Sequence, residues 1–350
     1  MSFFDFGSIP IYSLDISDES FKFLRLADKK NGTVVDDFGE AELEKGAIDG
    51  GEVKNREKLA LGLKKIFSKK NIKFAAFSLP EEKGFLRTVR LSGMSREDAE
   101  KSIEFQIEEH VPLPASEVFF EYKILNGESG HFDAVINAFP KAVVESYLGA
   151  IESAGALPVC AESESESASR AILPKGVYKS SMIIDWGKMR ASFSVFEDDT
   201  LKFTSTIFLG GKLLDDAISR ELRVGKKEAQ KIKFETNIHK SQKTTDVFGA
   251  IFPIVSSLKD EAEKILDYWR SHSEGRMGME RIFLSGGDAN LFGLSEYLTD
   301  ELRIETTLAN PWVNIKFPHK YLPPMKMKDS LRFVSAIGLA LSVKNMEKII

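Results

Sequence analysis

Cysteine and histidine are both scarce in this chain of 350 residues. The single cysteine, Cys160, excludes an internal disulfide framework and is typical of a protein from a reducing compartment. The five histidines are scattered along the chain without the spacing of metal ligands. The sequence therefore predicts neither a disulfide scaffold nor a zinc site.

Long apolar runs and basic runs are absent as well. No stretch of about 18 consecutive apolar residues occurs, so we expect no segment to span a membrane. The N-terminal residues, MSFFDFGSIP, lack the basic region and long apolar core of a signal peptide. The net charge of −5 argues against a nucleic-acid binder. The 43% hydrophobic and 29% charged content fits a soluble globular protein that is long enough for two domains.

Two segments of the chain share one pattern. In Tyr12–Leu26 and again in Met182–Phe196, an apolar run reaches an aspartate, Asp15 or Asp185, before a tight polar turn and a second apolar run. Such a pattern predicts β-hairpins. Backbone N–H groups of a turn can bind a phosphate, while the carboxylate holds a metal ion or its water. The pair indicates either two ordinary hairpins or two halves of a duplicated protein that grip a nucleoside triphosphate.

A third segment, Arg281–Leu298, reads as a strand, a glycine turn at Ser285–Gly287 and an amphipathic helix. Leu291, Leu294 and Leu298 share one helical face. Glycines at the turn permit close approach of a flat ligand to the backbone. The order of the three segments resembles the actin-like ATPase superfamily, in which they form two phosphate loops and an adenosine loop.

The resemblance implies an α/β protein with the actin-like fold, a duplicated ribonuclease H-like fold. Strand and helix patterns between the loops predict a small β/α insert as well. One helix is predicted to begin after Ser95, with carboxylates in its first turn, and to stop at about His110. Another is predicted over Val247–Trp269, where Pro253 indicates a kink or a start. The expected organisation is a first large subdomain in 1–91, an insert in 92–157, a connection in 158–181, a second half in 182–328 and a closing helix in 329–350.

Nearly the full chain also resembles the PilM family of type IV pilus assembly proteins. The segments that carry this resemblance are Glu44–Val53, Leu91–Met94, Ile103–Leu113, Leu209–Gly211 with Ala217-Ile218, and Ala336–Ala340. The resemblance implies a cytoplasmic scaffold of the pilus alignment complex under the inner membrane. It implies ATP and Mg²⁺ as cofactors, and as partner a bitopic PilN-like protein whose N-terminal peptide docks at the insert. Self-association is a further expectation, whereas nucleic acid and direct membrane insertion are not expected.

The resemblance also implies which residues bind the nucleotide. They are Asp15, Ser17, Lys22, Asp185, Gly187, Lys188, Gly210, Gly211, Gln230, Lys233, Ser285, Gly286 and Gly287. Asp15 and Asp185 would hold Mg²⁺ through water. The acidic segment Glu162–Arg170 offers Glu162 and Glu164 as candidate catalytic carboxylates that orient a water. An acidic helix start is the alternative for both.

Several positions depart from the family pattern. Ser17 and Asp18 replace a glycine and a small hydroxyl residue, and Asp18 would add a negative charge close to the phosphates. Gln230 keeps hydrogen-bonding capacity but has lost a charge. Lys188 and Arg190 are extra cations that either contact phosphate or are solvated, and we favour the solvated interpretation. Together these departures predict weak or absent ATPase activity.

Two other functions remain open on the sequence. One is a small-molecule kinase of the same superfamily, although a clear Asp-x-Gly-Thr loop and a catalytic residue are not found. The other is an FtsA-like division protein, although the chain leaves no room for a separate membrane-targeting helix after Gly338–Leu341. For a docking partner we expect an extended peptide where the insert meets the first large subdomain, tested by charges on the Ala99–Ile103–Ile107 face.

Overall fold

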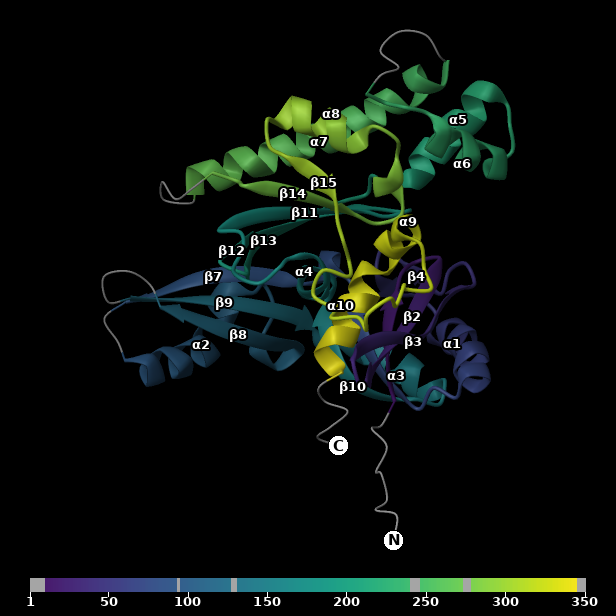
Figure 1. The fold of residues 1–350 in the computed structure, drawn as a ribbon. Helices are drawn as coiled ribbons and strands as arrows, with labels where there is room; N and C mark the ends of the chain where they lie inside the picture. The colour runs from purple at the N-terminus through teal and green to yellow at the C-terminus, as the bar shows by residue number, and fades with distance from the viewer. Residues whose placement is uncertain (1–9, 93–94, 127–130, 240–245, 273–277, 345–350) are drawn as a thin grey trace. The chain divides into compact units, whose positions relative to one another are not determined.

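The computed structural model describes residues 10–92, 95–126, 131–239, 246–272 and 278–344 (Figure 1). These residues divide into two compact units. The first unit comprises the described residues of Met1–Arg170, Ile315–Pro323 and Ser335–Ile350, and the second comprises those of Ala171–Asn314 and Pro324–Val334.

The first unit is built on a mixed five-stranded sheet in the order β10-β6-β1-β2-β3. β1 pairs in parallel with β6 and antiparallel with β2, while β6 pairs in parallel with β10 and β2 antiparallel with β3. The strands are β1 (Ile11–Ile16), β2 (Ser20–Lys29), β3 (Gly32–Glu42), β6 (Phe74–Leu79) and β10 (Leu157–Ser163). A two-stranded ribbon of β4 (Ile48–Asp49) and β5 (Glu52–Val53) follows β3.

The second unit repeats the same sheet. Its strand order is β15-β14-β11-β12-β13, again with three parallel strands followed by two antiparallel ones. The strands are β11 (Ser180–Trp186), β12 (Ala191–Glu197), β13 (Thr200–Ile207), β14 (Arg281–Ser285) and β15 (Thr306–Leu308). Because β1 corresponds to β11 and β6 to β14, the duplication predicted from the two hairpins is confirmed.

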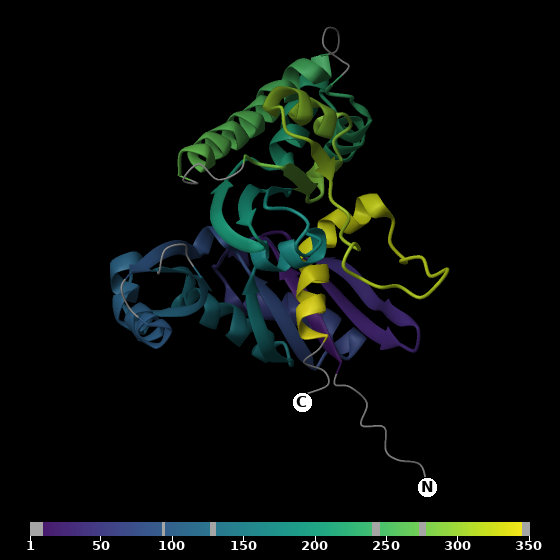
Figure 2. The same ribbon diagram turned by 60° about the vertical axis from the view of Figure 1, so that its left-hand side comes forward.

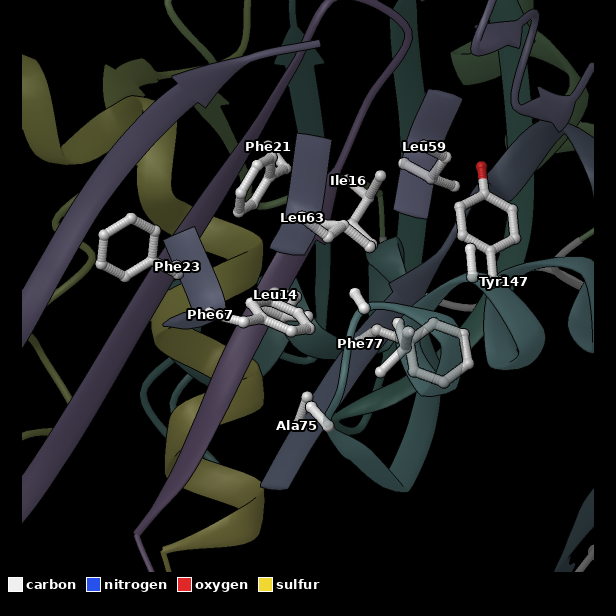
Figure 3. Close-up of a cluster of buried hydrophobic side chains, with 14 of the residues drawn as sticks. Leu14, Ile16, Phe21, Phe23, Leu59, Leu63, Phe67, Ala75, Phe77 and Tyr147 are labelled. Atoms are coloured by element: carbon white, nitrogen blue, oxygen red, sulfur yellow. The ribbon is translucent and has the colours of Figure 1, made fainter. Parts of the chain in front are cut away.

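Two helices cover one face of the first sheet. α1 (Arg56–Lys70) and α3 (Lys141–Ser153) lie side by side (Figure 1). α1 begins after Asn55, whose side chain accepts a hydrogen bond from the backbone N–H of Lys58, and it ends at Asn71 in the left-handed conformation. Alternate residues of β1 point into this core beside α1 and α3, as Figure 3 shows for Leu14 and Ile16 next to Phe77 and Tyr147.

The other residues of β1 lie on the opposite face of the sheet. There Ile11 packs with Leu339 and Val343 of α10 (Val334–Val343), which runs along the sheet in Figure 2. Asp15 is on this second face because side chains alternate along a strand. α4 (Glu164–Ile172) follows β10 directly. Residues 345–350 of the expected closing segment lie outside the described residues.

The second unit has helices of its own. They are α5 (Gly211–Leu222), α6 (Lys226–Glu235), α7 (Asp246–His272), α8 (Leu294–Leu302) and α9 (Met327–Ser330). α7 continues through Pro253 from Asp246, so the helix does not start at the proline. Within the described part of the chain, none of the helices combines the length and apolar character that crossing a membrane requires.

A separate three-stranded sheet lies between β6 and α3 in the chain. It consists of β7 (Phe85–Ser92), β8 (Val118–Asn126) and β9 (His131–Pro140), with β9 in the centre. α2 (Arg96–His110) covers one of its faces (Figure 1). The second unit has only a short turn between β14 and α8, so this small sheet and α2 are the extra element of the first half. We call Phe85–Pro140 the insert sheet.

The insert sheet differs in extent from the expected insert, 92–157. α3, which falls inside that range, contributes Val144, Tyr147 and Ile151 to the core of the first sheet. The helix face formed by Ala99, Ile103 and Ile107 is buried against the insert sheet, with at most 1% of each residue exposed. The interpretation of this face as a place to test peptide docking is therefore wrong, because charges there would disrupt the core of the insert.

Candidate functional site

The first hairpin holds Asp15 beside Lys22. The two residues oppose each other across β1 and β2, and the ammonium Nζ of Lys22 lies 3.2 Å from Oδ2 of Asp15. Both side chains are only 11–12% exposed. At the tip, the backbone N–H and the hydroxyl of Ser17 each donate to the carbonyl oxygen of Ser20 at 2.9 Å. Three predicted site residues therefore meet at one hairpin end.

Asp18 is turned into the protein rather than left in solvent. It is 8% exposed, and its Oδ1 accepts a hydrogen bond of 3.0 Å from the backbone N–H of Gly51. Gly51 has a φ of +72°, and its carbonyl oxygen accepts a hydrogen bond from the hydroxyl of Tyr147. The replacement at position 18 thus has a local structural partner that the sequence did not reveal.

The second hairpin brings Asp185 next to the glycine turn. β11 and β14 are parallel neighbours, with Asp185 opposite Ser285, and the Ser285 hydroxyl donates to Oδ2 of Asp185 at 3.1 Å. Gly286 follows with a φ of +87°. A Cβ atom on Gly286 would lie 2.3 Å from the carbonyl oxygen of Trp186, so only glycine fits here.

The tip of the second hairpin caps the N-terminus of α5. The backbone N–H groups of Gly211 and Lys212 donate to the carbonyl oxygens of Gly187 and Lys188, at 3.0 and 2.9 Å. These contacts satisfy donors that a helix N-terminus otherwise leaves unpaired. Gly210 allows the approach, since a Cβ atom there would lie 2.2 Å from the Lys188 carbonyl oxygen.

The two extra cations of this hairpin have different surroundings. Lys188 is exposed, whereas Arg190 is only 8% exposed. The interpretation of both residues as solvated is therefore wrong for Arg190.

Lys233 lies at the centre of a buried ionic network. Its ammonium Nζ is 2.5 Å from Oδ1 of Asp288 and 2.7 Å from Oδ1 of Asp215. The three side chains are only 4–7% exposed. Gln230 donates from its amide Nε2 to the other oxygen of Asp215 at 3.1 Å, and the Gly211 carbonyl oxygen lies 3.4 Å from the Lys233 ammonium.

Burial in this network shifts the pKa of the Asp288 carboxyl group. Burial raises the pKa of its carboxyl group, and the neighbouring Asp215 raises that pKa further, while Lys233 and then Arg332 act in the opposite direction. The Asp288 carboxylate touches the backbone of Gly211 so closely that a Cβ atom there would lie 1.9 Å from Oδ2. Asp215 and Asp288 were not predicted as site residues from the sequence. One signal was available, because Gly211 and Asp215 are four residues apart and so share a helix face.

Glu162 and Glu164 lie at the junction of β10 and α4. Glu162 accepts hydrogen bonds from Arg170 at 2.6 Å, from the Ser167 hydroxyl at 3.2 Å and from the Ser342 hydroxyl of α10. Glu162 therefore ties β10 to α4 and α10. Glu164 is the first residue of α4, where a carboxylate suits the helix dipole.

Acidic side chains from three elements gather around this junction. Burial raises the pKa of Glu166 in α4, and the charge of Glu121 in β8 raises it further. Burial also raises the pKa of Glu121, and the charge of Glu162 adds to this effect. Burial and then the charge of Glu162 raise the pKa of the Cys160 thiol to about 11. Among the described residues, no group of His, Cys, Asp and Glu side chains has the arrangement of a metal site.

The predicted site residues thus form two sets. Asp15, Ser17, Lys22, Glu162 and Glu164 belong to the first unit, and the remaining predicted residues belong to the second.

Solved structures share this fold over almost its whole length. MreB5 of Spiroplasma citri bound to ADP is 14% identical, with a TM-score of 0.56 over 97% of this chain and 98% of that one. The ethanolamine utilization protein EutJ from Carboxydothermus hydrogenoformans is also 14% identical, with a TM-score of 0.56 over 94% of this chain and 88% of that one. The duplicated sheet and the two hairpins, with these likenesses, define a protein of the actin-like ATPase fold.

A closer likeness is found to a structure described as a PilM-PilN type IV pilus biogenesis complex. That chain is 20% identical, with a TM-score of 0.78, and the alignment covers 96% of this chain and 99% of that one. The family model for type IV pilus assembly protein PilM matches residues 13–344. The chain belongs to the PilM family of type IV pilus assembly proteins, which favours the pilus role over a small-molecule kinase or an FtsA-like division protein.

Proposed function

We propose that this protein is a scaffold of the type IV pilus inner-membrane complex that docks the N-terminal peptide of a bitopic PilN-like protein. The family match over 13–344 carries this proposal, and the solved PilM-PilN complex supports the choice of partner. The partner would hold the protein at the cytoplasmic side of the inner membrane. Self-association of the chain remains compatible with this role.

The insert sheet is the element that we assign to the peptide. It is the part of the first half that has no counterpart in the second, and specific functions are commonly built on such additions to a shared fold. With β9 in the centre, β7 and β8 are both edge strands of this sheet. An edge strand can accept an extended peptide through backbone hydrogen bonds.

The start of β8 is the most suitable position along these edges. Phe119 is 46% exposed there, although large aromatic side chains are usually buried. The ammonium of Lys141, at the start of α3, lies 5.3 Å from the centre of its ring. This place joins the insert sheet to the first large subdomain, and exposed aromatic residues often dominate binding energies at interfaces.

ATP with Mg²⁺ is the ligand that we propose for the two hairpins and the glycine turn. In the first unit the residues fit such a ligand, because Asp15 and Lys22 are paired at the hairpin end. An anionic ligand could draw on Lys22, and Asp15 could hold a hydrated Mg²⁺. In the second unit Asp185 and the glycine turn also fit. Lys233 does not fit, because carboxylates of the chain itself surround its ammonium. We therefore propose weak nucleotide binding with little or no hydrolysis.

Removal of the insert sheet tests the docking proposal. Phe85 and Ala138 are direct partners in the ladder of β7 and β9. An Asn-Gly turn can therefore replace residues 86–137 while β6, α3 and their core remain. Binding of a fluorescent peptide with the first residues of the PilN-like partner is then measured by anisotropy. We expect binding to be lost, and unchanged affinity in the folded variant would overturn the proposal.

A point variant locates the peptide more finely. Phe119→Ser should weaken peptide binding at least tenfold, since it removes an exposed aromatic contact. Phe208→Ser is the matched control, because Phe208 is 69% exposed and lies in the second unit. Equal affinities for the two variants would exclude the start of β8 as the docking position.

A further inference from the structure

The ammonium group of Lys233 is occupied by oxygens of the chain itself, with hydrogen bonds to Asp288 and the Gly211 carbonyl and an ion pair to Asp215. A lysine ammonium carries three N–H donors. Three oxygens surround it, from Asp288 at 2.5 Å, from Asp215 at 2.7 Å and from the Gly211 carbonyl at 3.4 Å. Any ligand oxygen that is to reach Lys233 must therefore compete with these neighbours.

The network also contains more negative than positive charge. Two carboxylates face one ammonium, and their side chains are all at most 7% exposed. Charges interact strongly when water is excluded. An anionic ligand that approaches Lys233 therefore meets repulsion from the second carboxylate as well as competition for the donors.

Asp288 is the partner that can leave most readily. Asp215 lies within α5 and is also held by the amide of Gln230. Asp288 begins a three-residue 3-10 turn, directly after the glycine turn. The exposed Arg332 side chain, which follows α9, is the other cation that acts on Asp288. Asp288 can therefore move towards a second cation, whereas Asp215 remains in its helix.

We infer that Asp288 is an intramolecular competitor that occupies Lys233 in place of a nucleotide and so keeps nucleotide affinity low. This inference rests on the proposed binding of ATP to the hairpins and the glycine turn. Beyond that proposal, Asp288 is identified as the residue that limits nucleotide binding. Removal of Asp288 should leave Lys233 paired with Asp215 alone, which is a neutral pair, so the protein should stay folded.

Titration of Mg-ATP into variants tests this inference by calorimetry. Asp288→Ala removes both the charge and the bulk against Gly211, and we expect ATP to bind at least tenfold more tightly than to the wild type. Asp288→Asn removes only the charge and should give a smaller gain. Asp267→Asn is the matched control, because Asp267 is 67% exposed and pairs only with Arg270 among the contacts described for it.

The outcomes separate the inference from the proposed function. Tighter binding by Asp288→Ala than by the Asp267→Asn control supports both, and it does so even when the wild type shows no measurable binding. Equal affinities for the wild type and all variants would overturn the competitor role and leave ATP binding intact. Failure of every variant to bind millimolar Mg-ATP would overturn ATP binding and the inference with it.

A second measurement does not depend on nucleotide. Lys233 is labelled by reductive methylation of the native protein, and the extent is read by mass spectrometry. We expect strong protection in the wild type and at least fivefold faster labelling in Asp288→Ala. Lys226 serves as the internal control, because its side chain is 69% exposed. Equal protection of Lys233 in both proteins would show that Asp288 does not hold the ammonium.

Discussion

The Oδ1 atom of Asp18 accepts a hydrogen bond from the backbone N–H of Gly51, at 3.0 Å. Both residues are buried, and Gly51 lies in the turn between β4 and β5. The contact joins the first hairpin to the ribbon that follows β3. The aspartate that departs from the family pattern therefore stabilises the loop in which it occurs, instead of only adding charge near a ligand.

Truncation of Asp18 should destabilise the protein. In Asp18→Ala the buried N–H of Gly51 loses this acceptor, and an unsatisfied buried donor costs about 1–3 kcal/mol. Asp18→Asn retains an acceptor oxygen and should lose less than about 1 kcal/mol. Urea unfolding measures both, with Asp49→Ala as an exposed control from the same ribbon. A free energy of unfolding that is the same for Asp18→Ala and the wild type would contradict the assignment.

Two adjacent glycines of the glycine turn, Gly286 and Gly287, should respond differently to alanine. Gly286 has a φ of +87°, and a Cβ atom would lie 2.3 Å from the backbone of Trp186. Gly287 has a φ of −65°, and its nearest contact would be the Arg332 side chain at 3.3 Å. We expect Gly286→Ala to lose more than about 2 kcal/mol of unfolding free energy and Gly287→Ala less than about 1 kcal/mol. Thermal unfolding of the two variants side by side decides the matter, and similar losses would show that the turn has another conformation.

The carboxyl group of Glu166 should make stability depend on pH. Burial, and then the charge of Glu121, raises its pKa above the unfolded value of 4.5. The folded state therefore binds the proton more tightly than the unfolded state, and the ionised carboxylate destabilises the fold above the folded pKa. This penalty amounts to about 1.4 kcal/mol for each unit of pKa shift, and it disappears as the pH falls below 4.5.

Glu166→Gln removes the ionised form. We expect the variant to be more stable than the wild type at pH 7 and equal to it near the acid end of the range, at roughly pH 4. Urea titrations at both pH values measure the difference, with the exposed Glu228→Gln as control. A variant that is less stable than the wild type at pH 7 would show that Lys123 and Arg170 outweigh the burial.

Local signals predicted most helix limits. Ser95, with carboxylates in the next turn, predicted a helix that stops at about His110, and α2 spans Arg96–His110 with Ser95 as its cap. The single helix predicted from the three leucines after the glycine turn is wrong in part. Leu294 and Leu298 lie in α8, whereas Leu291 ends a 3-10 turn, and Gly293, with a φ of +86°, separates them. Spacing of three residues is common to both kinds of helix, so the pattern alone could not distinguish them.

The ionic network could not be predicted from the sequence in the same way. Lys233 and Asp288 are 55 positions apart, and their contact depends on the packing of α6 against the glycine turn. Sequence patterns report faces of single elements, and they do not report which faces meet. The sequence therefore predicted Lys233 as a nucleotide-binding residue without indicating that Asp215 and Asp288 surround its ammonium. The same reasoning applies to Asp18 and Gly51, which come together only after β3 and its ribbon fold back.

Hydrolysis of ATP should be far slower than the usual enzymatic range of about 1–10³ s⁻¹. One of the two candidate catalytic carboxylates, Glu162, is held by Arg170 and by hydroxyl groups of α4 and α10, so its oxygens already have partners. Steady-state phosphate release from Mg-ATP measures the rate. Asp15→Asn alters the first hairpin, so any activity that persists in this variant comes from a contaminant. Glu162→Gln should lower stability without changing the rate, and Glu164→Gln should change the rate by less than about twofold, as expected of a carboxylate that starts a helix. A wild-type rate inside the enzymatic range that Asp15→Asn abolishes would contradict the scaffold role and favour an enzyme.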